Sequence, residues 1–287
     1  MNAPHHAPLI QPPRVLLLGG PGSGKTYSLS TLLEAGLEVF VIITEPVGLD
    51  TLIDVVTAKK LPIAKLHWHS ITPSRPGFDS LKDMAKKVAM MDYEAVSKLR
   101  PASNRTHAQW IKVLECLSNF TCQRDGKSYG PVDQFSSDRV VVVDSLSGLN
   151  VMAMDITIGD KPTAHQGEWG IAMQQLEKLI LALTSIPSCP FVLTAHTERE
   201  VNEITGVTQV MASALGRKLA PKLPRFFSEV VLAYREGEQF WWSTTATGVD
   251  LKNRALPLNA KLQPSFVPIF EVYRKRLAAT AISDYSI

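Results

Sequence analysis

The segment of residues 14–37 constrains the fold more than any other part of the chain. Four apolar residues, 15–18, precede the sequence Gly-Gly-Pro-Gly-Ser-Gly-Lys-Thr at positions 19–26, and a helix-compatible stretch begins at Tyr27. This is the strand–loop–helix context of the pattern G-x-x-x-x-G-K-T, whose glycines let consecutive backbone N–H groups point at phosphate oxygens. The positive end of the helix adds to that attraction. We therefore predict a phosphate-binding loop, the alternative being a glycine-rich turn without a ligand.

The side chains of this loop have separate expected roles when the bound phosphates are those of ATP. Lys25 would reach the β- and γ-phosphates, and the Thr26 hydroxyl would hold Mg²⁺. ATP and Mg²⁺ are thus the expected ligands. The residues expected to bind the nucleotide are Gly19, Gly20, Pro21, Gly22, Ser23, Gly24, Lys25, Thr26 and Tyr27.

Three further apolar runs predict the rest of a parallel sheet. Residues 39–43, 140–143 and 191–195 are rich in apolar and β-branched side chains, which is typical of parallel strands buried on both faces. We predict an α/β fold with a mostly parallel central sheet and helices on both faces. Residues 229–234 and 239–245 are expected to add antiparallel strands at one edge.

A polar side chain stands at the end of each of these three runs: Glu45, Asp144 and His196. Open α/β sheets bind their ligands at the carboxyl edge, so we expect the three side chains to meet there. Asp144 would complete the Mg²⁺ site with Thr26. Glu45 would activate the attacking water, the alternative being a capping or surface acid. His196 would either sense the γ-phosphate or make a structural hydrogen bond.

Length and composition fit one large domain with an insertion. The chain has 287 residues, of which 45% are hydrophobic, enough for a sizeable core. We expect a flexible N-terminal arm at 1–13, an ATPase domain at 14–270 and a C-terminal tail at 271–287. The polar segment 73–130 has helical periodicity and is interpreted as a helical insertion on the core.

The cysteines and the charge exclude several classes of protein. Cys116, Cys122 and Cys189 form no C-x-x-C pair, so neither a disulfide framework nor a zinc site is expected, and a reducing compartment fits. No apolar run approaches the length of a membrane span. We expect a cytoplasmic protein without a membrane partner. A net charge of +3 is too small to indicate nucleic-acid binding by itself.

Two smaller features suggest binding sites. His67 and His69 share one face of a strand expected at 65–69, but a metal pair would need a third ligand, and none lies nearby in the sequence. We interpret both as surface or edge histidines. The segment 215–227 holds a cluster of cations with no acid between them, which suggests contact with DNA, the alternatives being a solvated face or a contact with a neighbour's ATP. This basic cluster consists of Arg217, Lys218, Lys222 and Arg225.

The order of these motifs resembles the RecA-like ATPase core, in which the catalytic acid lies on the strand after the phosphate-loop helix. The likeness covers about residues 14–270 and is strongest to short RecA-like recombinases and annealing ATPases of bacteriophages. One departure is His196, which stands where many recombinases have glutamine. The segments that carry the likeness are 44–50 (TEPVGLD), 144–149 (DSLSGL), 167–170 (GEWG), 194–200 (TAHTERE) and 215–227.

The resemblance implies partners and further site residues. Two mobile loops, 152–170 and 197–215, would touch single-stranded DNA, and the protein would form a homo-oligomer, filament or ring, with ATP between subunits. Lys252 and Arg254 are similar to a pair that reaches a neighbour's ATP in hexameric RecA-like helicases; an ordinary surface turn is the alternative. A single-strand-binding protein is a further partner that the resemblance suggests.

Three functions remain open at this point. The chain could be a DNA-dependent ATPase of phage recombination, annealing or repair, acting in the cytoplasm of the bacterial host. It could instead be a ring-forming helicase or translocation motor, or an ATP-binding switch that recruits a partner. We favour the first, with ATP hydrolysed to ADP and phosphate and stimulated by DNA.

Overall fold

The computed structural model describes most of the chain. The described residues are 10–46, 48–73, 77–92, 94–95, 108–159, 161, 164–186, 188–201, 206, 208–216 and 218–283. The strands are β1 Arg14–Leu18, β2 Glu38–Ile43, β3 Leu66–Ser70, β4 Arg139–Asp144, β5 Phe191–Ala195, β6 Thr197–Val201, β7 Thr208–Ala212, β8 Glu229–Glu236 and β9 Gln239–Ser243. The α-helices are α1 Lys25–Glu34, α2 Gly48–Ala58, α3 Phe78–Ala89, α5 Gln109–Ser118, α6 Leu146–Ile158, α7 Gln166–Thr184 and α8 Val267–Ser283.

Seven strands form the central sheet, in the order β3-β2-β4-β5-β1-β8-β9. The first six run parallel, and β9 pairs antiparallel with β8 through a register that sets Leu232 against Ser243. The inner strands β1 and β5 are buried at every position, as uninterrupted apolar runs require. The prediction of an α/β fold with a mostly parallel sheet and an antiparallel edge is confirmed.

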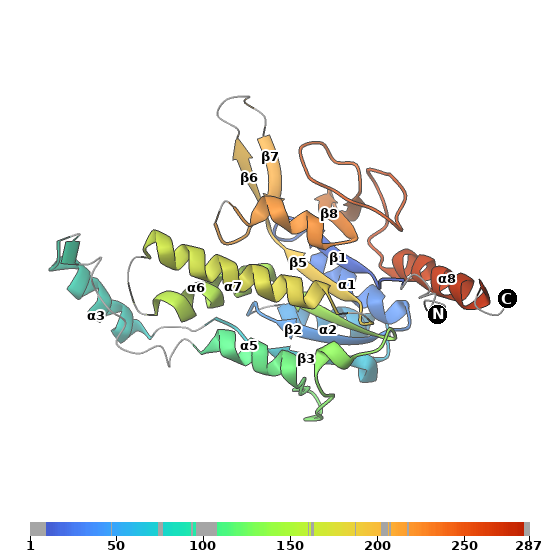
Figure 1. Cartoon of the computed structure of the whole chain (residues 1–287), viewed down its shortest axis with the longest axis horizontal. Helices are drawn as coiled ribbons and strands as arrows, with labels where there is room; N and C mark the ends of the chain where they lie inside the picture. Colours follow the sequence, from blue (N-terminus) through green and yellow to red (C-terminus); the bar gives the residue numbers. More distant parts are fainter. Residues whose placement is uncertain are drawn as a thin grey trace, which may run out of the picture.

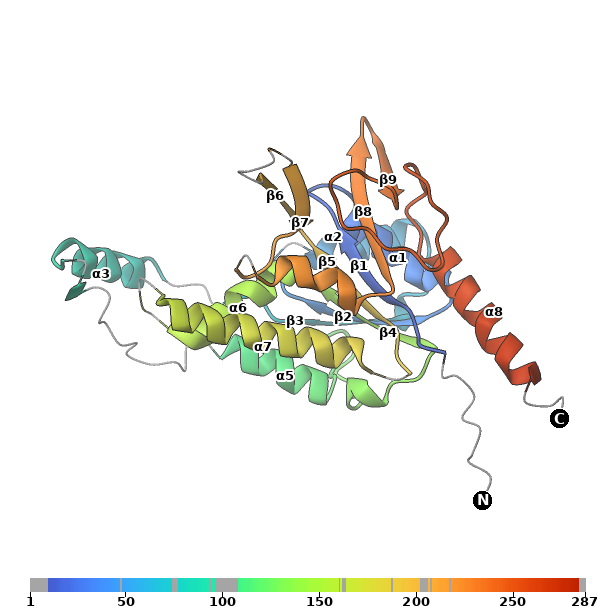
Figure 2. The ribbon, with the colours of Figure 1, turned by 45° about the horizontal axis from the view of Figure 1, so that its top comes forward.

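Strands β1, β2, β4, β5 and β8 send alternate side chains to two separate hydrophobic cores, because side chains alternate across a sheet. Leu16 and Phe40 pack on the face covered by α5, α6 and α7. Val15 and Val39 pack on the opposite face, which α1, α2 and α8 cover. Figures 1 and 2 show the two layers of helices and the sheet between them.

Both ends of the chain pack against this core within the segments that we expected to be a flexible arm, 1–13, and a tail, 271–287. Pro12 and Pro13 are buried, and the carbonyl of Pro13 accepts a hydrogen bond of 3.0 Å from the Phe191 amide. Helix α8 continues through the expected boundary at residue 270 and buries Phe270 and Tyr273. The arm therefore packs from residue 12 onward, and the tail is largely helix; residues 1–9 and 284–287 lie outside the described residues.

The segment expected as a helical insertion has two different parts. Helix α5 belongs to the main core, where it buries Trp110 and Val113 against the sheet. Helix α3 lies away from the body (Figure 1), and its residue Phe78 is 91% exposed. Of these two helices, α3 therefore has the character of an insertion, whereas α5 is part of the core.

Both segments expected as mobile loops contain regular structure. Residues 152–158 belong to α6 and residues 166–170 to α7, which starts at Gln166 because His165 and Glu168 form a capping box there. Residues 197–215 hold an antiparallel hairpin of β6 and β7, which projects from the body in both views. Of the helices in the described ranges, none combines the length and the apolar character that crossing a bilayer demands.

Candidate nucleotide site

The glycine-rich loop between β1 and α1 has a backbone that only glycine can supply at two positions. Gly24, at the N-terminus of α1, has φ of 83°, and a Cβ atom there would lie 2.8 Å from Cδ1 of Phe240. At Gly19 a Cβ atom would lie 2.5 Å from the carbonyl oxygen of Ala233. Ser23 is buried below the loop, and Pro21 and Gly22 form its exposed crest. The backbone amides before α1 are thus free of side-chain obstruction, as a phosphate cradle requires.

Lys25 lies inside this loop with 7% of its surface exposed. Its ammonium group donates hydrogen bonds to the carbonyl oxygens of Gly19, at 2.8 Å, and Gly20, at 2.9 Å. Burial lowers the pKa of Lys25, and the nearby carboxylates of Asp144 and Glu45 partly oppose that shift. A positive charge is therefore held under the loop where phosphate oxygens would lie.

Thr26 and Asp144 meet across the end of the sheet. The Thr26 hydroxyl donates a hydrogen bond of 2.8 Å to Oδ2 of Asp144, and the hydroxyl of Thr194 donates to the other oxygen, Oδ1. Burial raises the pKa of Asp144, while the hydrogen bonds from Thr194 and Thr26 act in the opposite direction. One hydroxyl oxygen and one carboxylate oxygen side by side are the hard donors that Mg²⁺ prefers. The residues present therefore fit the expected ion.

Glu45 and His196 form the third part of the site. His196 Nε2 lies 3.2 Å from Oε1 of Glu45, and the Ser145 hydroxyl donates to the same oxygen. His196 Nδ1 lies 3.5 Å from the ammonium nitrogen of Lys25. The side chains of His196 and Glu45 are 27% and 35% exposed, so water can reach both. The structure thus brings the side chains from the ends of β2, β4 and β5 together at the loop.

Aromatic side chains flank the loop on its outer side. Tyr27 stacks on Phe240 of β9 with ring centroids 5.9 Å apart, and the ammonium group of Lys59 lies 5.0 Å from the Tyr27 ring centroid. Tyr27, Phe240 and Trp241 line an open hollow of about 670 Å³. A flat apolar wall beside the phosphate loop can hold a nucleobase by stacking.

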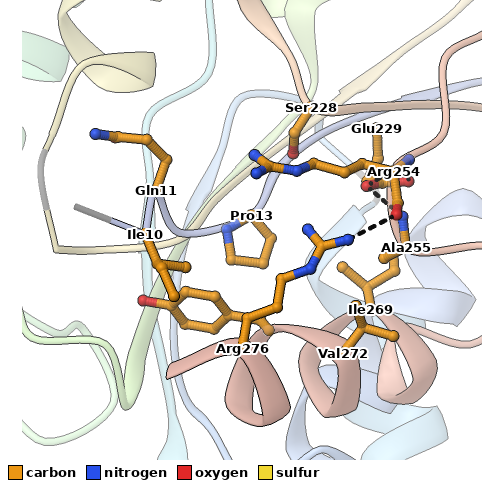
Figure 3. Close-up of a pocket in the computed structure, with 11 residues that line it drawn as sticks. Ile10, Gln11, Pro13, Ser228, Glu229, Arg254, Ala255, Ile269, Val272 and Arg276 are labelled. Carbon is orange, nitrogen blue, oxygen red and sulfur yellow. Dashed lines mark hydrogen bonds between the residues drawn. The ribbon is translucent and has the colours of Figure 1, made fainter. Parts of the chain in front are cut away.

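Lys252 and Arg254 lie at the other end of the sheet. Lys252 pairs with Val230 at the start of β8, whereas the phosphate loop follows the far end of the parallel strand β1. The backbone N–H of Arg254 donates to both carboxylate oxygens of Glu229, at 3.0 Å each; Figure 3 shows this turn beside Arg276. Neither cation can reach the ATP of its own chain, so only a role at a neighbour's site stays predicted.

The basic cluster is less free of acids in space than in sequence. Glu177 of α7 pairs with Lys222, at 3.0 Å, and with Arg225, at 3.2 Å. Lys218 is exposed, and Arg217 lies outside the described residues. The segment has no acid in its own sequence, but Glu177, 45 residues before Lys222 in the chain, folds against Lys222 and Arg225 and neutralises part of their charge.

Sequence reasoning missed three residues of this site. Thr194 is a lone hydroxyl in an otherwise apolar strand, which is a usable signal for a polar role. Ser145 adjoins Asp144 and could have been noticed for the same reason. Phe240 carries no signal, because an aromatic residue in an edge strand is ordinary.

Comparisons with known proteins give a family and a distant likeness in fold. A protein-family model described as an AAA domain matches residues 11–255. Among curated proteins no match was found. The RadB recombinase structure is 13% identical over 88% of this chain and 86% of its own, with a TM-score of 0.38. A prototypical ATPase from the type III secretion system of pathogenic bacteria is also 13% identical over 78% of this chain, with a TM-score of 0.38.

These two likenesses are too distant to bear on function. The chain spans about half of the secretion ATPase, 53% of its length. The match of the family model extends from before β1 to beyond β9 and contains the whole site described above.

Proposed function

This chain belongs to the AAA domain family and carries its nucleotide-binding core, and we propose that it hydrolyses ATP in a process on single-stranded DNA, such as recombination, annealing or repair. The observation that supports the proposal is the meeting of three groups at one sheet edge. These are Lys25 under the phosphate loop, the Thr26–Asp144 pair and the Glu45–His196 pair.

Each side chain would have one task in hydrolysis. Lys25 would turn from the carbonyl groups of the loop to the β- and γ-phosphates and neutralise their charge. Thr26 and Asp144 would hold Mg²⁺, which supplies further neutralisation of the phosphate oxygens. Glu45 would orient a water molecule in line with the γ-phosphorus and accept its proton. The bond to the bridging oxygen then breaks, and ADP and phosphate result.

His196 would act through Glu45. Its ring lies between the carboxylate of Glu45 and the ammonium group of Lys25, so it is placed to hold both in the geometry that the reaction needs. Serine at position 145 supports Glu45 from the other side. We propose that His196 is a positioning residue that responds to the γ-phosphate.

The part of the proposal that concerns DNA rests on charge and position. Lys218 is exposed and follows Arg217 in the sequence, and exposed cations gain affinity for nucleic acid by releasing counterions. The hairpin of β6 and β7 begins directly after His196. Lys222 and Arg225 contribute less net charge to such a surface, because Glu177 neutralises part of it.

An assembly with ATP between subunits completes the proposal. Lys25 is the cation that faces the two acids Glu45 and Asp144, whereas Lys59 and Arg235 lie against the rings of Tyr27 and Phe240 on the outer side of the loop. Phosphoryl transfer gains about 10³ to 10⁵ in rate from a positioned arginine. We propose that Arg254 and Lys252 of a neighbouring subunit supply that charge when the protein assembles into a filament or a ring. The protein itself would be of phage or other origin.

The test measures ATP turnover with and without single-stranded DNA. Glu45→Gln should bind ATP yet lose about 10² to 10⁴ in turnover, because the amide keeps the shape but cannot accept the proton. Glu115→Gln is the matched control, since Glu115 is exposed on α5, away from the phosphate loop. Unchanged turnover in Glu45→Gln would remove this residue from the mechanism.

The same assay separates the competing functions. DNA stimulation of turnover supports the proposal, and unwinding of a forked duplex would favour a helicase instead. ATP binding without any turnover would indicate a switch that recruits a partner.

A further inference from the structure

A buried histidine lies beside a cysteine and an aspartate at the edge of the sheet opposite to β9. The sequence led us to expect His67 at the surface or at an edge; it lies on the edge strand β3 but is 1% exposed, because the turn after α5 folds over that strand. Cys122 and Asp125 of that turn approach it. The ring nitrogens of His67, the Cys122 sulfur and an Asp125 oxygen supply ligand atoms that all lie within 4.8 Å of one another.

The hydrogen bonds of His67 fix which of its ring nitrogens carries the proton. Nε2 lies 3.1 Å from Oε1 of Glu38, and a carboxylate that also pairs with Arg139, at 2.9 Å, is ionised and can only accept. Nε2 is therefore the donor. Nδ1 is then an acceptor in the neutral ring, and it has no hydrogen-bond partner among the described residues. Its distance to Oδ2 of Asp125 is 3.9 Å, which is too long for a hydrogen bond.

A buried acceptor such as Nδ1 without a hydrogen-bond donor destabilises the folded state. The ring of His67 cannot rotate away from this position. It stacks on Phe40 with centroids 4.7 Å apart and leans on Tyr129 at 4.3 Å. A histidine whose other nitrogen donates to a carboxylate is the usual arrangement of a metal ligand, since the carboxylate orients the ring.

From these contacts we propose that His67 Nδ1, Cys122 Sγ and an Asp125 carboxylate oxygen form a binding site for a zinc-like divalent cation, with water as the fourth ligand. Sulfur and imidazole favour zinc over magnesium or calcium. Binding releases the Cys122 proton to solvent, so that thiolate and carboxylate balance the two charges of the ion.

The geometry needs only a small contraction. Tetrahedral zinc with bonds of about 2.0 to 2.3 Å holds its ligand atoms about 3.3 to 3.7 Å apart, so the widest gap of 4.8 Å has to shorten by roughly 1 Å. The turn that carries both outer ligands is short: the Gly126 amide donates to the Cys122 carbonyl at 2.8 Å.

Asp125 already has partners that do not exclude a metal. Oδ2 accepts from Arg124, at 2.9 Å, and from the Tyr129 hydroxyl, at 3.1 Å, and Oδ1 accepts from the Lys127 amide, at 3.1 Å. Two carboxylate oxygens offer about four acceptor positions, and the fourth partner of Asp125 is the Cys122 thiol, whose position becomes free for the ion when Cys122 loses its proton. These donors would then orient the ligand as a second layer.

The site would fasten a peripheral turn to the sheet. β3 is the outermost strand on this side, and the turn already bonds to it through the Gln123 amide, which donates to the Trp68 carbonyl at 2.9 Å. A cation shared by His67 of β3 and two residues of the turn would hold that edge covered, which protects it from pairing with other chains.

The experiment titrates the full-length protein with Co²⁺, in excess Mg²⁺ so that the oxygen-ligand site of the phosphate loop is filled. We expect one equivalent to give a near-ultraviolet thiolate-to-cobalt band together with the visible bands of tetrahedral Co²⁺, both displaced by Zn²⁺. Cys122→Ser should lose the thiolate band, and His67→Gln should lose the tetrahedral bands. Cys116→Ser, which changes another buried cysteine, should keep both.

A second readout covers variants that fold poorly. Above saturation, each tenfold increase in free Zn²⁺ should raise the melting temperature of the unmodified protein by about 3 °C, and in Asp125→Asn that rise should begin only at a higher concentration of free Zn²⁺. Retention of the thiolate band in Cys122→Ser would overturn the proposal. So would a melting temperature of the unmodified protein that does not respond to Zn²⁺.

Discussion

Removing the hydroxyl of Thr194 should weaken Mg²⁺ binding without disturbing the fold. Thr194 is fully buried in β5, and its hydroxyl donates to Oδ1 of Asp144. Thr194→Val keeps the shape and the β-branched character that a strand favours. The only group lost is the hydroxyl that stabilises the ionised carboxylate.

The size of the effect on Mg²⁺ binding depends on how strongly the ionised form of Asp144 is stabilised. Burial already raises its pKa, and Thr194 and Thr26 oppose that shift. When Mg²⁺ is bound, the Thr26 hydroxyl would face the ion, which leaves Thr194 as the donor to the carboxylate. A hydrogen bond to a charged group contributes about 1.5 to 3 kcal/mol, so the loss of the Thr194 hydroxyl should raise the pKa of Asp144 further and weaken the binding of Mg²⁺ to the carboxylate.

The assay measures ATP turnover as a function of Mg²⁺ concentration and pH. The Mg²⁺ concentration for half-maximal turnover should increase about 10- to 100-fold in Thr194→Val. Because Mg²⁺ binds the ionised carboxylate, activity is lost as pH falls through the pKa, and that acidic limb should move to higher pH. Thr194→Ser is the control, since it keeps the hydroxyl and should retain the Mg²⁺ requirement. An unchanged Mg²⁺ requirement in Thr194→Val would refute this reasoning.

Three other predictions concern charge and assembly. Asp144→Asn should raise the melting temperature of the nucleotide-free protein by a few degrees at neutral pH, because the pKa of Asp144 is raised by burial and its ionised form therefore destabilises the fold. This increase in melting temperature should vanish at acid pH, where Asp144 is protonated in both the folded and the unfolded state. An increase that persists at acid pH would contradict the argument. Arg254→Ala and Lys25→Ala should each be inactive, and mixing them should restore part of the ATP turnover; no recovery in demonstrated mixed assemblies would exclude a role in trans. Lys218→Ala should reduce the salt dependence of single-stranded DNA binding by about one ion, and a slope that stays the same would show that Lys218 does not contact phosphates.

The strands and the strand-end site could be predicted because their sequences are extreme. Residues 140–143 are four consecutive valines, which have no stable place except a buried strand. Once such strands are parallel, their carboxyl ends share an edge, so Asp144 and Glu45 had to lie near the phosphate loop. The geometry follows from topology and needs no knowledge of side-chain contacts.

The hairpin of β6 and β7 could not be predicted in this way. Strand β6 reads Thr-Glu-Arg-Glu-Val, and most of its residues are exposed, so it lacks the alternation of apolar and polar residues that marks a half-buried strand. Its partner β7 reads Thr-Gln-Val-Met-Ala and buries Met211 and Ala212, and the two strands pair through an antiparallel backbone register. A polar sequence is therefore compatible with both a loop and this hairpin.

Contacts between residues distant in the chain were also out of reach. Glu177 neutralises part of the basic cluster from another helix, and Cys122 reaches His67 from 55 residues away. The sequence shows each residue type but not the fold-back that brings the pairs together. The absence of a ligand close in sequence was therefore no argument about the surroundings of His67.

The attachment of the hairpin to His196 has a mechanical consequence. Strand β6 begins at the next residue, and the amide of Ser213, which follows β7, donates to the His196 carbonyl at 2.7 Å. Both strands of the hairpin are thus attached to one residue of the nucleotide site, His196, which forms the hinge. Five residues of β-strand extend about 16 Å, so a tilt of about 10° at the hinge would move Val201 by roughly 3 Å. A small rotation at the nucleotide site would thus move the far end of β6 by about the width of an atom.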